Sequence, residues 1–201
     1  MPSDFFANQS FHKQDYTTNL LPKGEYDSCT FINCNFENSE IANISFLECE
    51  FIDCNLSNTN IMHTKFQDVE FTNCKMVGLE FQNSDEFLRS FSFLECQLDY
   101  STFIETNIDN TKFDNCKLIG VDFTEASAKK IKFLNCNLAD AIFSKTNLEH
   151  ADFYSAYNYT IEPQNNRLTK AIFNINQLEG LLKSTGIIIK QWSLNSVGYM
   201  L

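Results

Sequence analysis

The sequence predicts an all-β solenoid with a four-sided core, followed by a short C-terminal α-helix. Every fifth residue from Tyr26 to Phe81 is large and apolar. A second column of smaller residues, many of them cysteine, lies two positions before each large residue. The same pattern resumes in a new phase from Phe93 to Phe153, with Ala128 as its one small member.

A five-residue spacing does not suit one long helix or one long strand. In an α-helix five residues advance about 500°, so successive apolar residues would leave no single apolar face. In a strand five is an odd number, so they would alternate between faces. A short extended segment followed by a corner buries both columns. If each pentad turns one corner of a square, four pentads make one coil, and coils stack about 4.8 Å apart.

We expect one continuous solenoid with irregular ends and one interruption. The lead-in keeps the large column but lacks the small one, and the phase shifts by two residues between the repeat blocks. The expected order is an irregular N-terminal lead-in or cap (1–25), a β-helix (26–160) in two blocks (26–81 and 93–155) with an insertion (82–92), and a C-terminal cap, helix and dimerisation tail (161–201). The expected core stack includes Phe31, Phe51, Phe71, Phe93, Phe113, Phe133 and Phe153.

The C-terminal tail contains helix signals. Asn176–Glu179 matches a capping box, and Gly186 suits the position after the last helical residue. The leucines share one helical face, which is too large to leave exposed. We therefore expect a homodimer with twofold symmetry. Its interface is expected to contain Leu178, Leu181, Leu182, Ile187, Ile188 and Ile189.

The eight cysteines all fall in the small column, at positions where serine, threonine, alanine or valine stand in other pentads. Free cysteine behaves as a small, readily buried residue. No Cys-x-x-Cys pair suggests a zinc site. We therefore expect buried, reduced thiols.

The chain carries a net charge of −11, and its acidity lies in the repeats. Residues 26–155 contain 21 acidic and 9 basic side chains. This balance disfavours direct nucleic-acid binding and suits a partner with a basic groove, while solubility alone is the alternative explanation. The sequence has no apolar run of membrane-spanning length and no signal-peptide pattern, so we expect a cytoplasmic protein.

No catalytic, metal or cofactor site is expected. The three histidines are far apart in sequence, and the chain lacks a phosphate-binding glycine loop, a nucleophile elbow and a zinc-protease motif. A core filled with phenylalanine and leucine leaves no interior cavity for a substrate. The sequence therefore favours a binding protein over an enzyme.

Two features are candidates for partner binding. Outward acidic residues recur at intervals of one coil, and the insertion combines charged and apolar residues. Irregular loops on rigid scaffolds often bind partners. The alternative interpretation is that the insertion is only a hinge, with Phe87 or Leu88 folded back over the core. The candidates are Glu48, Glu50, Asp68, Glu70, Asp85, Glu86, Phe87, Arg89, Glu105 and Glu125.

The repeat units resemble the pentapeptide-repeat family, whose consensus is roughly Ala-Asp/Asn-Leu-X-X. Examples are Cys-Asn-Leu-Ser-Asn (54–58), Cys-Asn-Leu-Ala-Asp (136–140) and Ala-Asp-Phe-Tyr-Ser (151–155). The resemblance covers about residues 26–155 and implies a right-handed quadrilateral β-helix.

The architecture further resembles the topoisomerase-protecting subgroup, which includes the quinolone-resistance, albicidin-resistance and microcin B17 immunity proteins. The shared features are the length, the two blocks with one insertion, and a tail with a helix and a Gly-Ile-Ile-Ile segment. This resemblance implies an acidic, dimeric rod that imitates duplex DNA, binds DNA gyrase or topoisomerase IV and gives tolerance of a poison. The alternative is a structural or interaction scaffold with another protein partner.

Overall fold

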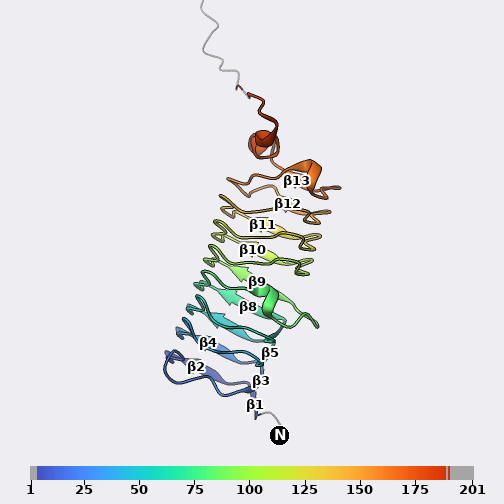
Figure 1. The fold of residues 1–201 in the computed structure, drawn as a ribbon. Coiled ribbons are helices and arrows are strands. Elements are labelled where there is room, and N and C mark those ends of the chain that lie inside the picture. The colour runs from blue at the N-terminus through green and yellow to red at the C-terminus, as the bar shows by residue number, and fades with distance from the viewer. Residues whose placement is uncertain (1–3, 189, 191–201) are drawn as a thin grey trace, which may run out of the picture.

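The protein is a parallel β-solenoid with one short C-terminal helix, as the computed structural model in Figure 1 shows. The structure describes residues 4–188 and 190. Successive coils pair in parallel at an offset of 20 residues, so that Phe31 lies opposite Phe51 and Phe51 opposite Phe71. The predicted fold class is therefore confirmed.

Two parallel sheets form two sides of the solenoid. The first has four strands: β1 (Asp4–Ala7), β3 (Gly24–Asp27), β5 (Ser45–Leu47) and β7 (Lys65–Gln67). The second runs the length of the rod with nine: β2 (Ser10–His12), β4 (Thr30–Ile32), β6 (Glu50–Ile52), β8 (Val69–Thr72), β9 (Phe91–Leu94), β10 (Lys112–Asp114), β11 (Lys132–Leu134), β12 (Asp152–Phe153) and β13 (Ile172–Phe173). Isolated bridges such as Asn35 to Asn55 and Glu40 to Asn60 connect coils elsewhere.

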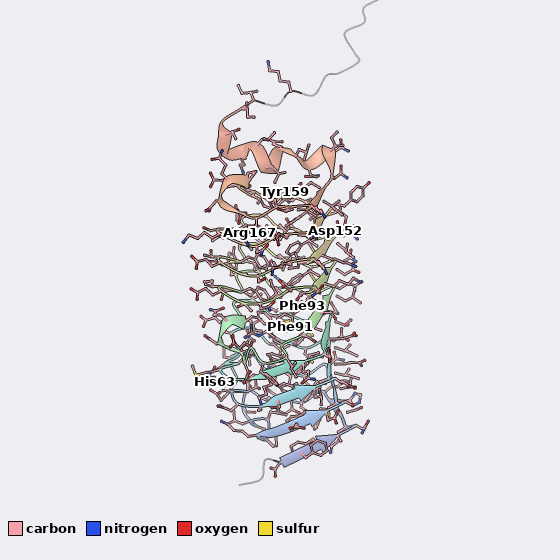
Figure 2. The ribbon with its side chains drawn as sticks, turned by 90° about the vertical axis from the view of Figure 1, so that its right-hand side faces the viewer. His63, Phe91, Phe93, Asp152, Tyr159 and Arg167 are labelled. Atoms are coloured by element: carbon pink, nitrogen blue, oxygen red, sulfur yellow. The ribbon has the colours of Figure 1, made fainter. Side chains whose placement is uncertain are left out.

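The core consists of large side chains stacked from coil to coil. All seven phenylalanines of the expected stack are at most 1% exposed. The Phe93 and Phe113 ring centroids are 4.8 Å apart and nearly parallel, and Phe103 and Phe123 repeat this stacking at 5.4 Å. Stacked aromatic pairs add stabilisation beyond their buried area. Figure 2 shows Phe91 and Phe93 inside this stack.

The cysteines and several threonines of the small column share one hydrogen-bonding pattern. The Cys49 thiol donates to the Tyr26 carbonyl oxygen at 3.2 Å, and the Thr59 hydroxyl donates to the Phe36 carbonyl oxygen at 2.7 Å. Both acceptors lie 23 residues before the donor, at a large residue of the preceding coil. Cysteine and threonine can therefore exchange at this position, and all eight cysteines are buried and free.

The corners use left-handed backbone. Positive φ recurs at the second residue after most of the large core residues, for example 54° at Asn33 and 60° at Asn43. Asparagine is the commonest residue there, because its short polar side chain tolerates this conformation better than most.

The N-terminal region is more regular than the sequence suggested. An irregular lead-in was expected for residues 1–25, but β1 and β2 pair in register with β3 and β4. Phe6 stacks on Tyr26 with centroids 4.6 Å apart, and Phe11 stacks on Phe31 at 4.8 Å. These large side chains are enough to hold a regular coil although the small column is missing.

The C-terminal cap is helical but shorter than expected. It contains α1 (Glu179–Leu182), with 3-10 turns at Ile175–Gln177 and Lys183–Thr185. Asn174, not Asn176, caps the first turn, and its side chain accepts a hydrogen bond from the Asn176 amide at 3.0 Å. Gly186 has φ of 71°, as expected of a residue that ends a helix.

The cap packs directly on the last core ring. Gly180 lies so close to the Tyr159 ring and carbonyl that a side chain there would collide with them. The Ile161 amide donates to the Gly180 carbonyl oxygen at 2.9 Å. Tyr159 lies just beneath the helical cap in Figure 2. Two further 3-10 turns, at Phe81–Asn83 and Pro163–Asn165, complete the described elements, and no described helix could cross a membrane.

Candidate protein-binding surface

Among the described residues the solenoid is interrupted once, where the chain between Asp85 and Ser90 leaves the stack. Strands β8 and β9 pair at an offset of 22 residues, with Phe71 opposite Phe93. Residues Asp85–Ser90, here called the 85–90 loop, project from the rod and are the green loop of Figure 1. Its ends stay in the backbone ladder, because the Asp85 amide donates to the Thr64 carbonyl and the Ser90 amide to the Phe66 carbonyl, both at 2.9 Å. The expected insertion spans 82–92, whereas β9 already begins at Phe91.

Phe91 fills the core beneath the loop. Its side chain is 7% exposed, and its ring centroid lies 5.3 Å from that of Phe81 and 5.2 Å from that of Phe93. Phe87 and Leu88 remain 68% and 56% exposed at the tip of the loop. The alternative in which Phe87 or Leu88 folds back over the core is therefore wrong, because Phe91 occupies that space.

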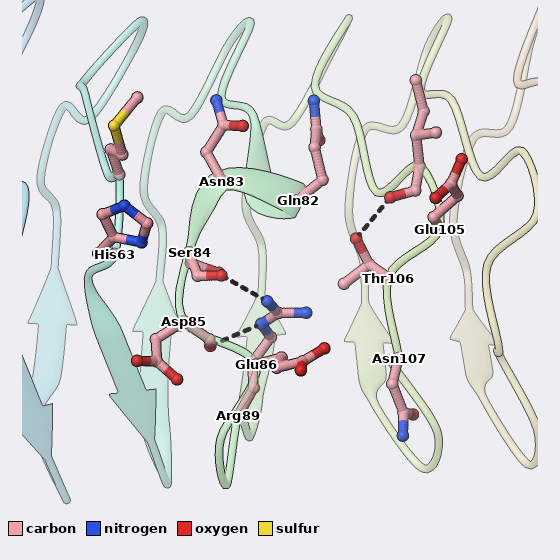
Figure 3. Close-up of a pocket in the computed structure, with 12 residues that line it drawn as sticks. His63, Gln82, Asn83, Ser84, Asp85, Glu86, Arg89, Glu105, Thr106 and Asn107 are labelled. Atoms are coloured by element: carbon pink, nitrogen blue, oxygen red, sulfur yellow. Dashed lines mark hydrogen bonds between the residues drawn. The ribbon is translucent and has the colours of Figure 1, made fainter.

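Arg89 holds the loop in shape. Its Nη2 donates to the Ser84 carbonyl oxygen at 2.6 Å and its Nε to the Asp85 carbonyl oxygen at 3.2 Å (Figure 3). Burial lowers the pKa of the guanidinium, and the nearby Glu86 and Asp85 carboxylates partly offset this effect. The side chain is half-buried, and two of its donor groups bind the carbonyls of the residues where the loop begins. Its first role is thus to position the loop.

Hollows flank the 85–90 loop on both sides. The larger, with a volume of about 920 Å³, lies between the loop and the coils next to it, and its lining includes His63, Glu86 and Glu105 (Figure 3). The smaller, of about 480 Å³, includes Asp68 and Glu70 in its lining. Arg89 lines both hollows. The loop and its hollows give a partner an apolar tip between two acidic recesses.

The first group of acidic candidates forms a compact cluster. Glu50 lies directly opposite Glu70 in the pairing of β6 with β8. Glu48 and Asp68 occupy corner positions of the same two coils, with φ of 50° and 51°. All four side chains are exposed, and none has a cationic partner within the described residues. The Ser90 hydroxyl donates to Asp68 and thereby joins this cluster to the loop.

The second acidic pair is less charged than expected. Glu105 and Glu125 occupy corners of successive coils. Lys145 from the next coil forms an ion pair with Glu125 at 2.7 Å, which reduces the negative potential at this end of the surface. In the described part of the chain, no cluster of His, Cys, Asp or Glu is arranged to hold a metal ion.

The pentapeptide repeat region model matches residues 25–103 and 66–143 of this sequence. The chain belongs to the pentapeptide repeat family. Its fold is similar to three structures of QnrB1, a plasmid-mediated fluoroquinolone resistance protein. One trypsin-treated form gives a TM-score of 0.73 at 15% identity, covering 94% of this chain and 93% of that chain. The full-length form gives 0.59 at 14% identity, covering 92% and 100%. No curated protein matches the sequence significantly.

Proposed function

We propose that this pentapeptide repeat protein is a non-enzymatic binder of DNA gyrase or topoisomerase IV and occupies the surface that holds duplex DNA. Binding would protect the enzyme from a topoisomerase poison, as self-immunity or drug tolerance in the cytoplasm. The proposal is supported by the fold shared with a fluoroquinolone resistance protein and by the acidic rod with its single projecting loop.

The charge density of the rod carries the DNA-mimicry argument. Residues 26–155 have a net charge of −12, from 21 acidic and 9 basic side chains. They occupy about 6.4 coils, or about 31 Å at 4.8 Å per coil. The rod thus presents about one net charge per 2.6 Å, compared with one per 1.7 Å in duplex DNA. A groove that binds DNA would attract this rod for the same electrostatic reason.

The acidic cluster and the loop would make different contributions. Glu48, Glu50, Asp68 and Glu70 would steer the rod toward a basic groove and account for the salt dependence of binding. Phe87 and Leu88 would supply the apolar anchor that charges alone lack, since buried aromatic residues often dominate binding energy. The loop would therefore control the lifetime of the complex more than its rate of formation.

The test is a gyrase supercoiling assay with and without a fluoroquinolone. Leu88 has φ of 55°, a conformation that asparagine accepts more readily than leucine. The double variant Phe87→Ala/Leu88→Asn should keep the fold and melting temperature of the parent but protect gyrase at least tenfold less well. Leu20→Ser is the matched control, because Leu20 is 63% exposed and lies far from the loop.

Replacing residues 82–92 with a short turn that preserves the repeat phase should have the same effect. Equal protection by the parent and by both loop variants would reduce the 85–90 loop to a hinge. The contact with the topoisomerase would then be made by the acidic cluster. Failure of the parent itself to bind or protect either topoisomerase would favour the alternative function, a scaffold for another protein, to which the exposed apolar tip is equally suited.

We also propose that the C-terminal cap forms a homodimer. Leu178, Ile187 and Ile188 are 38%, 58% and 83% exposed, whereas Leu181 packs against the core. Leu182 is half-buried, and Ile189 lies outside the described residues. Pairing of two caps about a twofold axis would cover these apolar side chains and lengthen the acidic rod.

A further inference from the structure

Two rows of outward side chains run along the nine-stranded sheet. The first, here called the charged row, places one residue on each of five consecutive strands, and the pairing register stacks them directly. It changes from acidic to basic about a neutral centre, in the order Glu50, Glu70, Ser92, Lys112 and Lys132. The four charged side chains are exposed. Only Lys112 has an ion-pair partner among the described residues, Asp114 at 2.8 Å on its own strand.

The second row, here called the alternating row, lies two residues further along the same strands. It alternates between apolar and polar side chains, in the order Ile52, Thr72, Leu94, Asp114 and Leu134. Leu94, at its centre, is 40% exposed although it lies in the middle of a sheet. Residues at equal distances on either side of β9 have the same polarity in the alternating row. In the charged row they have opposite charge.

We infer that this face of the nine-stranded sheet binds a second copy of the chain, face to face, with the two rods antiparallel. The twofold axis would lie along β9, between the two sheets. Such a rotation reverses the direction of the rod but keeps the direction of the strands, so each row faces the same row of the other copy. Two sheets packed in this way stand about 10 Å apart with nearly aligned strands.

This arrangement matches every position of both rows. Glu50 meets Lys132 of the second copy, and Glu70 meets its Lys112. In the alternating row Ile52 meets Leu134, Leu94 meets Leu94, and the Thr72 hydroxyl can donate to Asp114. A surface that is complementary to itself under a twofold rotation is the requirement for an isologous dimer.

The corner residues before the strands would form further favourable pairs in this dimer, whereas those after the strands include one unfavourable pair. Glu48 would face Lys130 and Asp68 would face Asn110, with Ser90 at the centre, and all of these except half-buried Ser90 are exposed. At the opposite corner Glu95 would face its own copy, which is unfavourable. This makes a specific prediction, because Glu95→Gln should strengthen the association.

The contact is small and the association is correspondingly weak. Five strands span about 24 Å, and one side of five residues is at most about 17 Å wide, which gives at most about 400 Å² per copy, compared with about 800 Å² in a standard interface. Each chain carries a net charge of −11. At 0.15 M salt the Debye length is about 8 Å, so repulsion between distant charges is screened while facing pairs at contact distance still attract. The inference does not depend on the proposed function.

Charge reversal with complementation is the decisive test. Glu50→Lys/Glu70→Lys makes the row basic at both ends, and Lys112→Glu/Lys132→Glu makes it acidic at both ends. Sedimentation equilibrium at 0.15 M salt and up to several hundred micromolar protein should show each variant associating at least tenfold more weakly than the parent. An equimolar mixture of the two should associate at least as strongly as the parent, because the rows then match between unlike copies.

Controls separate this surface from a C-terminal dimer. The charge-reversal variants and their mixture are measured both in the parent sequence and in a Leu178→Glu background. Leu178→Glu should weaken only pairing through the C-terminal cap. Circular dichroism melts should show that the exposed substitutions preserve the fold. If a double variant does not fold, it is replaced by single variants in which Glu50, Glu70, Lys112 or Lys132 is changed to Gln. The inference is overturned if the parent shows no charge-sensitive association, or if the mixture associates no better than its components.

Discussion

Phe113 tests whether the stacked rings stabilise the solenoid. Its side chain is fully buried, and its ring centroid lies 4.8 Å from that of Phe93 and 5.4 Å from that of Phe133 in stacked geometry. Phe103 and Phe123 meet it edge-on at 5.9 and 6.4 Å. Phe113→Ala therefore removes a ring that has aromatic neighbours above, below and across the core.

The expected loss of unfolding free energy is about 5 kcal/mol. Buried Phe→Ala substitutions cost about 3–5 kcal/mol, and aromatic pairs add about 0.5–1.5 kcal/mol each beyond buried area. The coils cannot close the gap without separating the backbone ladder, so the upper end of the range applies. Typical total stabilities are about 5–15 kcal/mol. Phe113→Asp would add the desolvation of a carboxylate and should prevent folding.

Urea unfolding followed by circular dichroism measures both effects. Phe11→Ala is the matched control, since Phe11 stacks on Phe31 at 4.8 Å but is half-buried on the first coil. The control should lose only about 2 kcal/mol, because its ring has a stacked neighbour on one side alone. A cooperative melt of Phe113→Asp near that of the parent, or equal losses for the two alanine variants, would refute this account of the core.

Four further outcomes are expected. Burial raises the pKa of the Cys49 thiol to about 12, so native protein should react slowly with a thiol reagent, whereas denatured protein should react at all eight cysteines. Since this pKa is higher than in the unfolded chain, its contribution to stability should be complete below about pH 9 and fall as the pH rises toward 12, which alkaline urea titrations would check. Arg89→Ala should speed chymotrypsin cleavage after Phe87 or Leu88 at least severalfold, and an unchanged rate would remove the positioning role of Arg89. Light scattering at micromolar concentration should give the mass of two chains for the parent and of one for Leu178→Glu, while a single-chain mass for the parent would reject the C-terminal dimer.

The repeat columns could be predicted from the sequence because each pentad obeys one local rule. A large apolar residue at every fifth position admits few backbone paths, and every predicted centre from Tyr26 to Phe81 is buried. The fully buried Ala128 fits the same rule despite its size. The positive φ at corners had a visible signal in the recurring asparagines, such as Asn33, Asn38 and Asn43.

The interruption could not be predicted in detail because several residues there compete for one core position. Phe87, Leu88 and Phe91 are all apolar, and their order along the chain does not say which one the backbone can return to the core. Arg89 donates hydrogen bonds to two carbonyl groups at the start of the loop, and no local sequence pattern encodes these contacts. The acidic pairs of the nine-stranded sheet could be recognised from the sequence. The lysines that continue the same row could be aligned with them only once the 22-residue offset between β8 and β9 was known.

The 20-residue offset between paired coils restricts how such a rod can change its length. Duplicating or deleting one whole coil would return every later residue to its former column and corner, and would alter the rod by about 4.8 Å. A change of any other size would rotate the downstream half around the long axis unless the surplus were looped out, as at 85–90. Four strand steps separate β9 from β13, or about 19 Å. The distance from the loop to the C-terminal cap can therefore change only in whole coils of about 4.8 Å. A partner that contacts both the loop and the cap would fit only rods whose length between them is a fixed number of coils.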